Sequence, residues 1–237
     1  MNKLSLVFTL LLANLTFAQT TEEKEATMKP SLWLDIWDAK QNVPSFNVLQ
    51  VGFNDIPRDI FYRGTLVECL EFDDANGHNL VFLTQTGKFP VSEKDENGKY
   101  KKVNDKAEIY AYMFTKSGNA NYRNMWKMMD VQACENLDLY VGFTKGSLSI
   151  TDVDGDNIAE VSFQHTKSCR SDVSPADRFL TCYESSQKFQ YVGITQLEGM
   201  PLEQATKDIK TPMAPEIGPL LDEKWTKFAE DSFIQFN

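Results

Sequence analysis

Four acidic side chains in one short stretch have the spacing of a cation-binding loop. They are Asp152, Asp154, Asp156 and Glu160. Carboxylates held together on one turn repel one another unless a cation neutralises them, and calcium prefers such oxygen ligands. Counted from Asp152, they stand at the first, third, fifth and ninth positions, and the seventh residue, Ile158, would add its backbone carbonyl. The spacing therefore predicts a calcium site.

The flanking residues indicate which kind of calcium loop this is. A helix-loop-helix site needs a carboxylate at the twelfth position, where this chain has Phe163. Residues 148–150 and 161–163 alternate apolar and polar side chains, as strands do. The stretch predicts a calcium-binding hairpin between two strands. The alternative is an acidic hairpin turn that uses Asp and Gly only for their turn geometry.

Other catalytic or metal-binding patterns are weakly represented. His78 and His165 are the only histidines, and the four cysteines lie too far apart for the close pairs of zinc or redox sites. A formal net charge of −10 disfavours nucleic acid or an anionic membrane as a partner. Hydrolysis of glycan by a carboxylate pair stays open, because 34 acidic residues always allow some suitable pair.

The beginning of the chain has the features of an export signal. A basic residue precedes an apolar run from Leu4 to Phe17, and small residues stand around Ala18. The run is shorter than the roughly 20 residues of a membrane span, and no later segment is apolar enough to be one. We expect residues 1–18 to be a signal peptide, residues 19–29 to be a flexible leader, and the protein to reach the periplasm or the cell surface.

Alternating apolar residues predict a chain built mainly from β-strands. Residues 32–37 and 46–53 have this pattern, and residues 65–72 and 79–84 have it most clearly. The last two runs flank Asn76-Gly77, a strong signal for a hairpin. We therefore expect successive antiparallel strands joined by short turns.

The sequence contains an internal similarity. Residues 74–80 match residues 152–158, and the tracts that follow each of them match loosely. We predict two hairpin repeats, at about 63–131 and 137–197, forming two similar antiparallel sheets packed as a sandwich in a single domain of residues 30–237. The first copy lacks half of the acidic side chains, so we expect it to bind no ion. The alternative is that both are only Gly-containing hairpins of a β protein.

A helix is expected near the C-terminal end, over about 219–230. Pro219 suits the first turn of a helix, where its missing N–H costs nothing. Leu221, Trp225 and Phe228 then form one apolar stripe, which predicts packing against a sheet.

Several runs of the chain occur together in a pattern that covers residues 63–194. They are Asp74-x-x-Gly77-x-Asn79, Thr84-Gln85-Thr86-Gly87, Trp126-Lys127, Asp130, Cys134, the acidic loop from Thr151 to Val161, and Cys169-Arg170-Ser171-Asp172-Val173-Ser174-Pro175. The combination resembles a family of exported bacterial proteins labelled surface polysaccharide biosynthesis protein. The acidic loop by itself resembles the calcium hairpins of the FG-GAP and VCBS repeat families.

The four cysteines of an exported chain suggest two disulfides, and the residues alone leave three pairings open. The resemblance implies that Cys134 pairs with Cys169, since both belong to the family's pattern. Cys69 and Cys182, which are outside the pattern, are then expected to form the second bridge.

Two functions remain, from different classes. The first is a non-catalytic, calcium-stabilised protein of the cell envelope that binds glycan or an envelope partner, or assists surface polysaccharide assembly, as the resemblance implies. The second is a hydrolase that acts on cell-surface glycan through a carboxylate pair. A groove lined by aromatic side chains would favour binding, and two carboxylates facing each other across a groove would favour hydrolysis.

Overall fold

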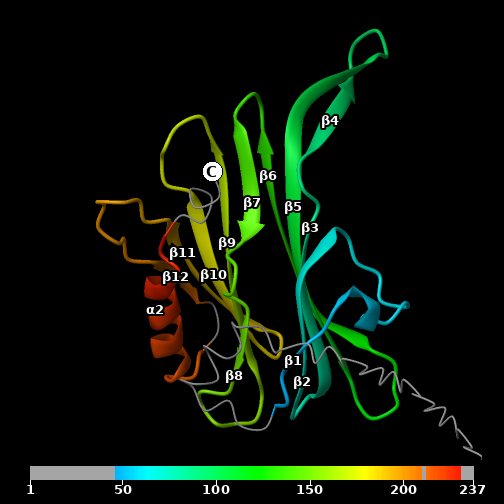
Figure 1. Cartoon of the computed structure of the whole chain (residues 1–237), viewed down its shortest axis with the longest axis vertical. Helices are drawn as coiled ribbons and strands as arrows, with labels where there is room; N and C mark the ends of the chain where they lie inside the picture. The colour runs from blue at the N-terminus through cyan, green and yellow to red at the C-terminus, as the bar shows by residue number, and fades with distance from the viewer. Residues whose placement is uncertain (1–45, 210–211, 231–237) are drawn as a thin grey trace, which may run out of the picture.

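The computed structural model describes residues 46–209 and 212–230 of the 237-residue chain. The signal peptide, the leader and the strand expected over residues 32–37 lie outside the described residues. The described part of the chain forms two six-stranded antiparallel sheets and one α-helix, α2 (Figure 1). This is the predicted mainly β architecture of two antiparallel sheets with a C-terminal helix.

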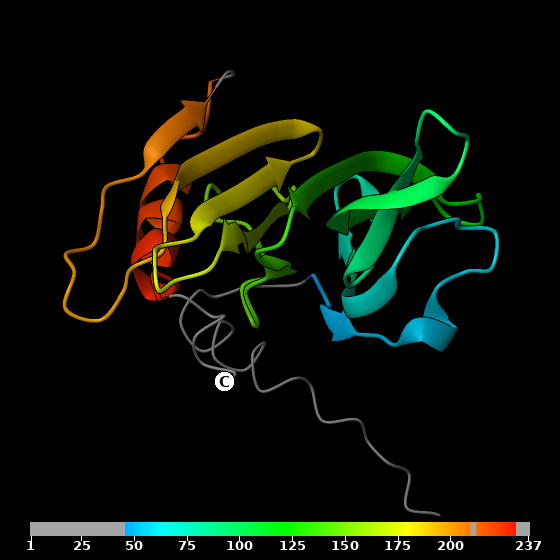
Figure 2. The same ribbon diagram turned by 90° about the horizontal axis from the view of Figure 1, so that it is seen from above.

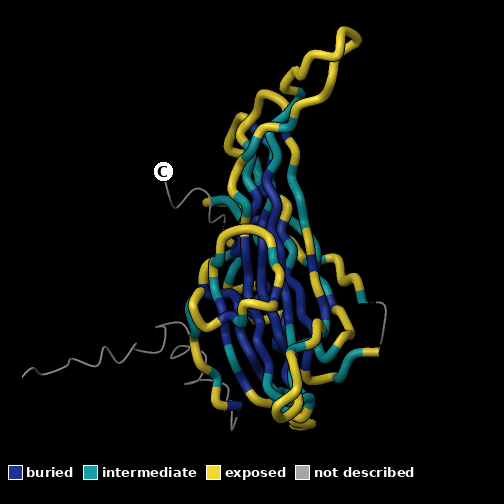
Figure 3. The backbone as a smooth tube through the Cα atoms, turned by 90° about the vertical axis from the view of Figure 1, so that its right-hand side faces the viewer, coloured by how far each residue is buried: buried dark blue, intermediate teal, exposed yellow. Residues whose placement is uncertain are grey.

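The first sheet, called sheet A, has the strand order β1-β2-β3-β5-β4, with β6 paired to β5. Its strands are β1 (Leu49–Gln50), β2 (Thr65–Asp74), β3 (Gly77–Gln85), β4 (Phe89–Lys94), β5 (Tyr100–Lys116) and β6 (Arg123–Cys134). The predicted Asn-Gly hairpin joins β2 to β3 through Ala75 and Asn76. The hairpin of β4 and β5 extends past the rest of the sheet (Figure 3).

The second sheet, sheet B, has the order β12-β11-β10-β9-β7, with β8 paired to β9. Its strands are β7 (Asp138–Phe143), β8 (Ser149–Thr151), β9 (Glu160–Arg170), β10 (Asp177–Glu184), β11 (Gln187–Ile194) and β12 (Thr206–Ile209). The succession β8-β9-β10-β11 repeats the succession β2-β3-β5-β6 of sheet A. The two sheets therefore share a strand arrangement.

The inner faces of the two sheets bury a common core. Apolar side chains from both sheets form it: Leu70, Phe72, Val81, Leu83, Ile109, Met113, Trp126, Val161, Phe163 and Tyr183. The rings of Trp126 on β6 and Tyr183 on β10 stack at 4.1 Å between centroids, directly across the two sheets. This core is the packed interior of a sandwich.

The outer face of sheet B is covered by α2 (Ile217–Lys227), on the side away from sheet A (Figure 2). Leu221 and Trp225 are buried against strand residues such as Tyr191. The helix begins earlier and ends earlier than the predicted 219–230. Ile217, at its start, is fully buried in the same cluster, so the apolar side chains packed on sheet B begin one turn earlier than the predicted stripe. The proline still lies in the first turn, where no N–H is required.

The outer face of sheet A is covered differently, by the irregular segment 51–63. Ile56 and Ile60 of this segment pack on rings and aliphatic side chains of β2, β3 and β5. The strand predicted over 46–53 is therefore largely wrong, because only the short β1 forms before the 3-10 helix η1 (Phe53–Asp55). The backbone turns there because Asp55 accepts the N–H of Gly52 at 2.7 Å.

The cysteines divide into one bridge and two free thiols. Cys134 at the end of β6 is bonded to Cys169 on β9, so the bridge joins sheet A to sheet B. The predicted bridge between Cys69 and Cys182 is wrong, since both are buried and free. Cys69 lies on the outer face of sheet A and Cys182 beneath α2 on the outer face of sheet B. The whole sandwich core separates them.

Candidate functional site

The acidic loop between β8 and β9 brings its carboxylates together. Carboxylate oxygens of Asp152, Asp154 and Asp156 lie within 4.8 Å of one another. Gly155, with a φ of 77°, takes the left-handed conformation that this tight loop needs. The three aspartates that the spacing predicted to converge therefore do lie close together.

A second set of carboxylates shares one member with the first. Oxygens of Asp154, Glu160 and Glu184 also lie within 4.8 Å of one another. Glu184, the last residue of β10, stands directly opposite Glu160 in the β9–β10 register. Glu184 was not predicted from the sequence, because only the pairing of β9 with β10, and no local motif, places it in the cluster.

The cluster concentrates negative charge in a partly buried place. Burial raises the pKa of Glu160 to about 7, and the nearby Asp154 and Asp152 act in the same direction. Burial also raises the pKa of Glu184, together with Asp154 and Asp156. Buried atom Oδ1 of Asp152 accepts no hydrogen bond from the described part of the chain. An all-oxygen set of this kind fits a hard cation such as calcium.

The loop itself is held by backbone donors. The Glu160 carboxylate accepts the N–H of Val153 with both oxygens at 3.1 Å, and Asp156 accepts the N–H of Ile158 at 2.7 Å. These contacts help to hold the carboxylates near one point. That the Ile158 carbonyl is a ligand stays a prediction.

The acidic loop also contacts the β2–β3 turn of sheet A. The N–H of Ala75 donates to the Asn157 carbonyl at 2.8 Å, and the N–H of Ala159 donates to Asp74 Oδ2 at 3.1 Å. The other Asp74 oxygen accepts the Asn79 side-chain amide at 2.7 Å. The Asp74 carboxylate thus binds hydrogen-bond donors of its own turn and of the acidic loop.

The two hairpin loops differ more than their sequence match suggests. Gly77 begins β3, whereas Gly155, its counterpart in the match, lies inside the longer loop between β8 and β9. A Cβ on Gly77 would lie 2.4 Å from the Lys116 carbonyl oxygen, so this turn requires glycine for close approach to β5. Gly77 and Gly155 therefore occupy different structural positions, although they match in the sequence.

A groove lies on the outer face of sheet A, where segment 51–63 meets β5 and β6. Its volume is about 360 Å³. It is lined by Asp59, Ile60, Phe61, Tyr112, Phe114, Tyr122, Asn124 and Lys127. Among these residues, Phe61 has 90% of its surface exposed.

Alternate residues of β5 form a row of aromatic rings on the outer face of sheet A, and two of them, Tyr112 and Phe114, line this groove. Tyr110, Tyr112 and Phe114 lie on the outer face, with centroids 5.9 and 6.4 Å apart in order. Phe82 of β3 extends this row, parallel to Phe114 at 5.9 Å. The Lys127 ammonium lies over the Tyr112 ring at 5.5 Å. Tyr112 is only 3% exposed, so the accessible rings of the groove are those of Phe61, Phe114 and Tyr122, with the Lys127 amine beside them.

Carboxylates contribute little to this groove. Asp59 is the one carboxylate among its lining residues. Glu108, at the end of the aromatic row, is bonded to Lys106 at 2.8 Å, Arg63 at 3.0 Å and the Tyr110 hydroxyl at 2.6 Å. Burial opposes its ionisation, but the bonds from Lys106 and Tyr110 outweigh burial and lower its pKa. Glu108 is therefore an ionised carboxylate whose charge is balanced by Lys106 and Arg63.

A second hollow, of about 370 Å³, lies between α2 and the segment that leads into β12. The ion pair of Lys207 and Asp222, at 2.9 Å, joins two of its lining residues. Its one aromatic residue, Trp225, is 5% exposed, and the indole N–H donates to the Glu203 carbonyl at 3.1 Å. This hollow offers no open ring face.

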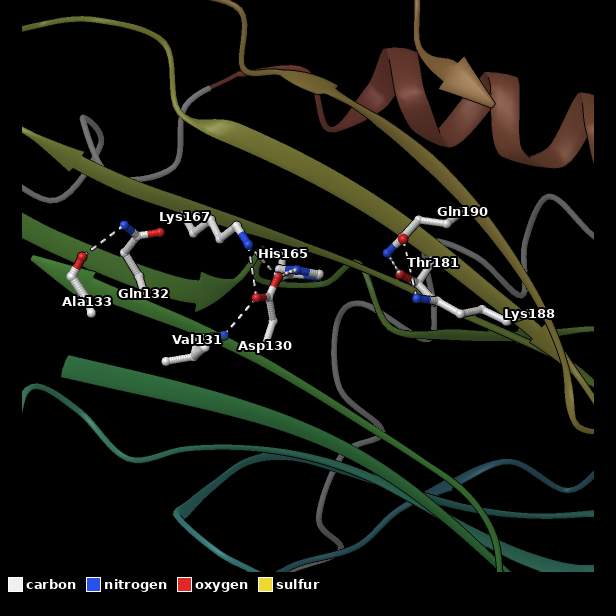
Figure 4. A network of polar contacts seen from close by, with 9 residues as sticks. All are labelled: Asp130, Val131, Gln132, Ala133, His165, Lys167, Thr181, Lys188 and Gln190. Carbon is white, nitrogen blue, oxygen red and sulfur yellow. Dashed lines mark hydrogen bonds and ion pairs between the residues drawn. The ribbon is translucent and has the colours of Figure 1, made fainter. Parts of the chain in front are cut away.

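Between the sheets, a polar cluster surrounds Asp130 of β6 (Figure 4). Its carboxylate accepts from His165 Nε2 at 2.9 Å and from Lys167 Nζ at 2.9 Å. Burial lowers the pKa of His165, and the ring stacks on Phe179 at 4.8 Å. Since β9 supplies His165 and Lys167 and β6 supplies Asp130, the cluster joins sheet B to sheet A.

Comparisons with protein-family models, curated proteins and solved structures found no match to the chain. Among the described residues, no helix is long and apolar enough to cross a membrane. The function of the candidate sites is therefore inferred from their geometry.

Proposed function

We propose that this protein is an exported, non-catalytic, calcium-stabilised protein of the cell envelope that binds glycan in the groove on the outer face of sheet A. The observation that carries the proposal is the aromatic lining of that groove. The C–H face of a sugar ring packs on aromatic rings, while amide, amine and carboxylate groups bond its hydroxyls. Phe61 and Tyr122 supply rings, and Asn124, Lys127 and Asp59 supply polar groups.

Calcium has a structural role in this proposal. The ion would be held by Asp152, Asp154, Asp156 and Glu160, with Glu184 as an additional carboxylate from β10. It would neutralise their repulsion and tie the β8–β9 loop to the end of β10. A structural disulfide suits the oxidising compartments outside the cytoplasm, which supports export. The resemblance to the surface polysaccharide family supports a role in glycan assembly at the envelope.

The hydrolase alternative is less well supported. A glycosidase needs two carboxylates on opposite sides of the scissile bond. Asp59 has no second carboxylate facing it among the residues that line the groove. The acidic cluster does contain several carboxylates, but they converge on one point rather than flank a groove.

The test is binding of purified mature protein to an array of bacterial surface polysaccharides, followed by titration of the strongest ligand. Phe61→Ala should weaken binding about tenfold, since one aromatic contact contributes roughly 1.5 kcal/mol at most. The matched control is Phe53→Ala, because Phe53 is also exposed, at 68%, but does not line the groove. Equal affinity of the two variants, or release of shortened glycan, would overturn the proposal.

A further inference from the structure

We propose that calcium in the acidic loop regulates the groove, so that its binding raises the affinity for glycan through the β2–β3 turn. This inference rests on the proposed function, because it concerns the same two sites. Its basis is a continuous set of contacts from the carboxylate cluster to one wall of the groove.

The first contact joins the acidic loop to the turn. Asn157 accepts the N–H of Ala75, and Asp74 accepts the N–H of Ala159, at 2.8 and 3.1 Å. Both Asn157 and Ala159 lie between the predicted ligands Asp156 and Glu160. A shift of either ligand therefore moves a hydrogen-bonding partner of sheet A.

A parallel contact comes from the β10–β11 turn. The Asn76 side-chain amide donates to the Ser185 hydroxyl at 3.2 Å. Ser185 directly follows Glu184, whose carboxylate belongs to the acidic cluster. The β2–β3 turn is thus bonded to both segments that carry the cluster.

The second step leads from the turn to the end of β5. The Thr115 hydroxyl donates to the Asn76 carbonyl at 3.3 Å. The close approach of Gly77 to the Lys116 carbonyl places the turn directly against the same strand end. Phe114, the preceding residue of β5, lines the groove.

The third step reaches the groove wall at Tyr122. The Lys116 ammonium lies 4.5 Å above the Tyr122 ring, and the His78 ring lies 6.0 Å from it. His78 is itself fixed by Glu71 at 3.1 Å and Asp73 at 2.9 Å, both on β2. Tyr122 is therefore positioned by residues that belong to the β2–β3 hairpin and to β5.

The physical cause is charge repulsion. Without a cation, the carboxylates of the loop repel one another, which favours a more open loop that gives up its bonds to Asp74 and Ala75. The bound ion favours the closed loop, and the closed loop holds the turn and, through it, Tyr122. By linkage, glycan must raise calcium affinity by the same factor, and couplings of this kind are typically about 5- to 150-fold.

The experiment measures glycan affinity of the mature protein in calcium and in chelator, with amide hydrogen exchange under the same two conditions. Wild type should bind glycan at least about fivefold more tightly in calcium. Calcium should also increase protection of residues 74–79 and 114–124. Exchange supplies a readout that does not depend on a glycan being found.

Variants of the turn should uncouple the two sites. Asp74→Ala removes the acceptor of the Ala159 N–H, and Thr115→Val removes the donor to Asn76. Each should still bind calcium, measured by terbium luminescence, but lose the calcium dependence of glycan affinity and of exchange at Tyr122. The matched control is Asp95→Ala, because Asp95 also accepts backbone N–H groups in a hairpin turn, that of β4 and β5.

The outcomes separate this inference from the proposed function. Calcium and glycan that both bind, with affinity and exchange unaffected by each other, would overturn the coupling and leave the function in place. Calcium-dependent protection near Tyr122 without any glycan binding would support the link from the acidic loop to Tyr122, but it would overturn the proposed function and with it the effect of calcium on glycan affinity. Failure to bind calcium, or a coupling that survives in both turn variants, would overturn the inference.

Discussion

The two sheets share a strand arrangement but differ in what covers their outer faces. Sheet B is covered by α2, whose Leu221 and Trp225 are buried against β10 and β11. Sheet A is covered by the irregular segment 51–63, which buries Ile56 and Ile60 and leaves a groove beside them. In this molecule the helix seals its sheet face, whereas the irregular segment leaves a groove in which Phe61, Phe114 and Tyr122 are at least partly exposed.

The difference follows from local sequence. Gly193 lets the Trp225 ring approach β11, since a Cβ there would lie 2.9 Å from the indole. Segment 51–63 contains Pro57, which lacks an N–H, and Gly52, whose N–H is taken by Asp55. Such a segment does not form a long helix, so it covers only part of the aromatic row.

The largest expected effect is on the free energy of unfolding. It is tested by replacing one aromatic residue of α2 and one of segment 51–63. Trp225→Ala should lower the free energy of unfolding by about 3–5 kcal/mol, because a buried ring leaves a cavity. The loss would include the contact of the Arg178 guanidinium with the indole, at 3.5 Å. Phe61→Ala should change the free energy by less than about 0.5 kcal/mol, as expected for an exposed side chain. Denaturant unfolding checks both, and similar losses would mean that the two covers do not differ.

The next largest expected effect is stabilisation by calcium, which should depend on the acidic loop of sheet B and not on the β2–β3 turn of sheet A. Calcium at 100 times its dissociation constant should stabilise the protein by about 2.7 kcal/mol, because it binds the folded loop. Chelation should lower the melting temperature of the wild type. Asp154→Ala should lower it in calcium and abolish the response to chelator. Asn76→Ala, the corresponding change in sheet A, should keep the response.

Thermal melts with native mass spectrometry measure these changes. A wild-type melt indifferent to calcium and chelator, with no bound metal, would show that the acidic loop is only a turn. A calcium response lost equally in Asn76→Ala would show that the two loops do not differ as described.

The smallest effect concerns a lysine sealed beneath α2. Lys224 is fully buried, and its ammonium contacts the hydroxyls of Ser149 and Ser162. Burial lowers its pKa to about 7, against the small opposing influence of Cys182. Because the unfolded chain keeps this proton up to about pH 10.4, the folded state binds fewer protons above pH 7. The contribution of Lys224 to stability therefore rises as pH increases from 7 towards 10.

Lys224→Met should remove this pH dependence. Between pH 7 and pH 9 the wild type should gain about 1–2 kcal/mol relative to the variant. At pH 7 the variant should be as stable as the wild type or more so, since replacing a buried charge by an apolar group is often neutral or stabilising. The two hydroxyls can still bond each other, at 3.1 Å. Urea unfolding across this pH range checks it, and parallel profiles would contradict the account.

The sequence predicted the features that depend on local pattern. Alternation and the Asn-Gly turn predicted antiparallel strands, and the spacing of Asp152, Asp154 and Asp156 predicted their convergence. Features that depend on register or on sheet faces were missed. Glu184 joins the acidic cluster only through its pairing with Glu160.

The other errors arise because the sequence does not show which face of each strand lies inside the sandwich. Alternation shows that two residues share a face but not which face lies inside, so the burial of Cys69 and Cys182 on opposite outer faces had no local signal. The groove was missed for the same reason, since its floor needs the outer residues of β5 and its wall needs Phe61 from an irregular segment. Phe228, placed in the helical stripe, follows α2, and its carbonyl accepts from Gln164 at 2.8 Å.

The most direct test of the central claim is an NMR titration that follows aromatic side-chain resonances while a bound polysaccharide fragment is added. Phe61, Phe114 and Tyr122 should shift with a common affinity, because they line the groove. Trp225 and Tyr191, sealed on the other sheet, should not respond. Shifts confined to Trp225 and Tyr191, or none at any ring in the presence of a fragment that binds, would contradict the claim that the incompletely covered sheet holds the ligand.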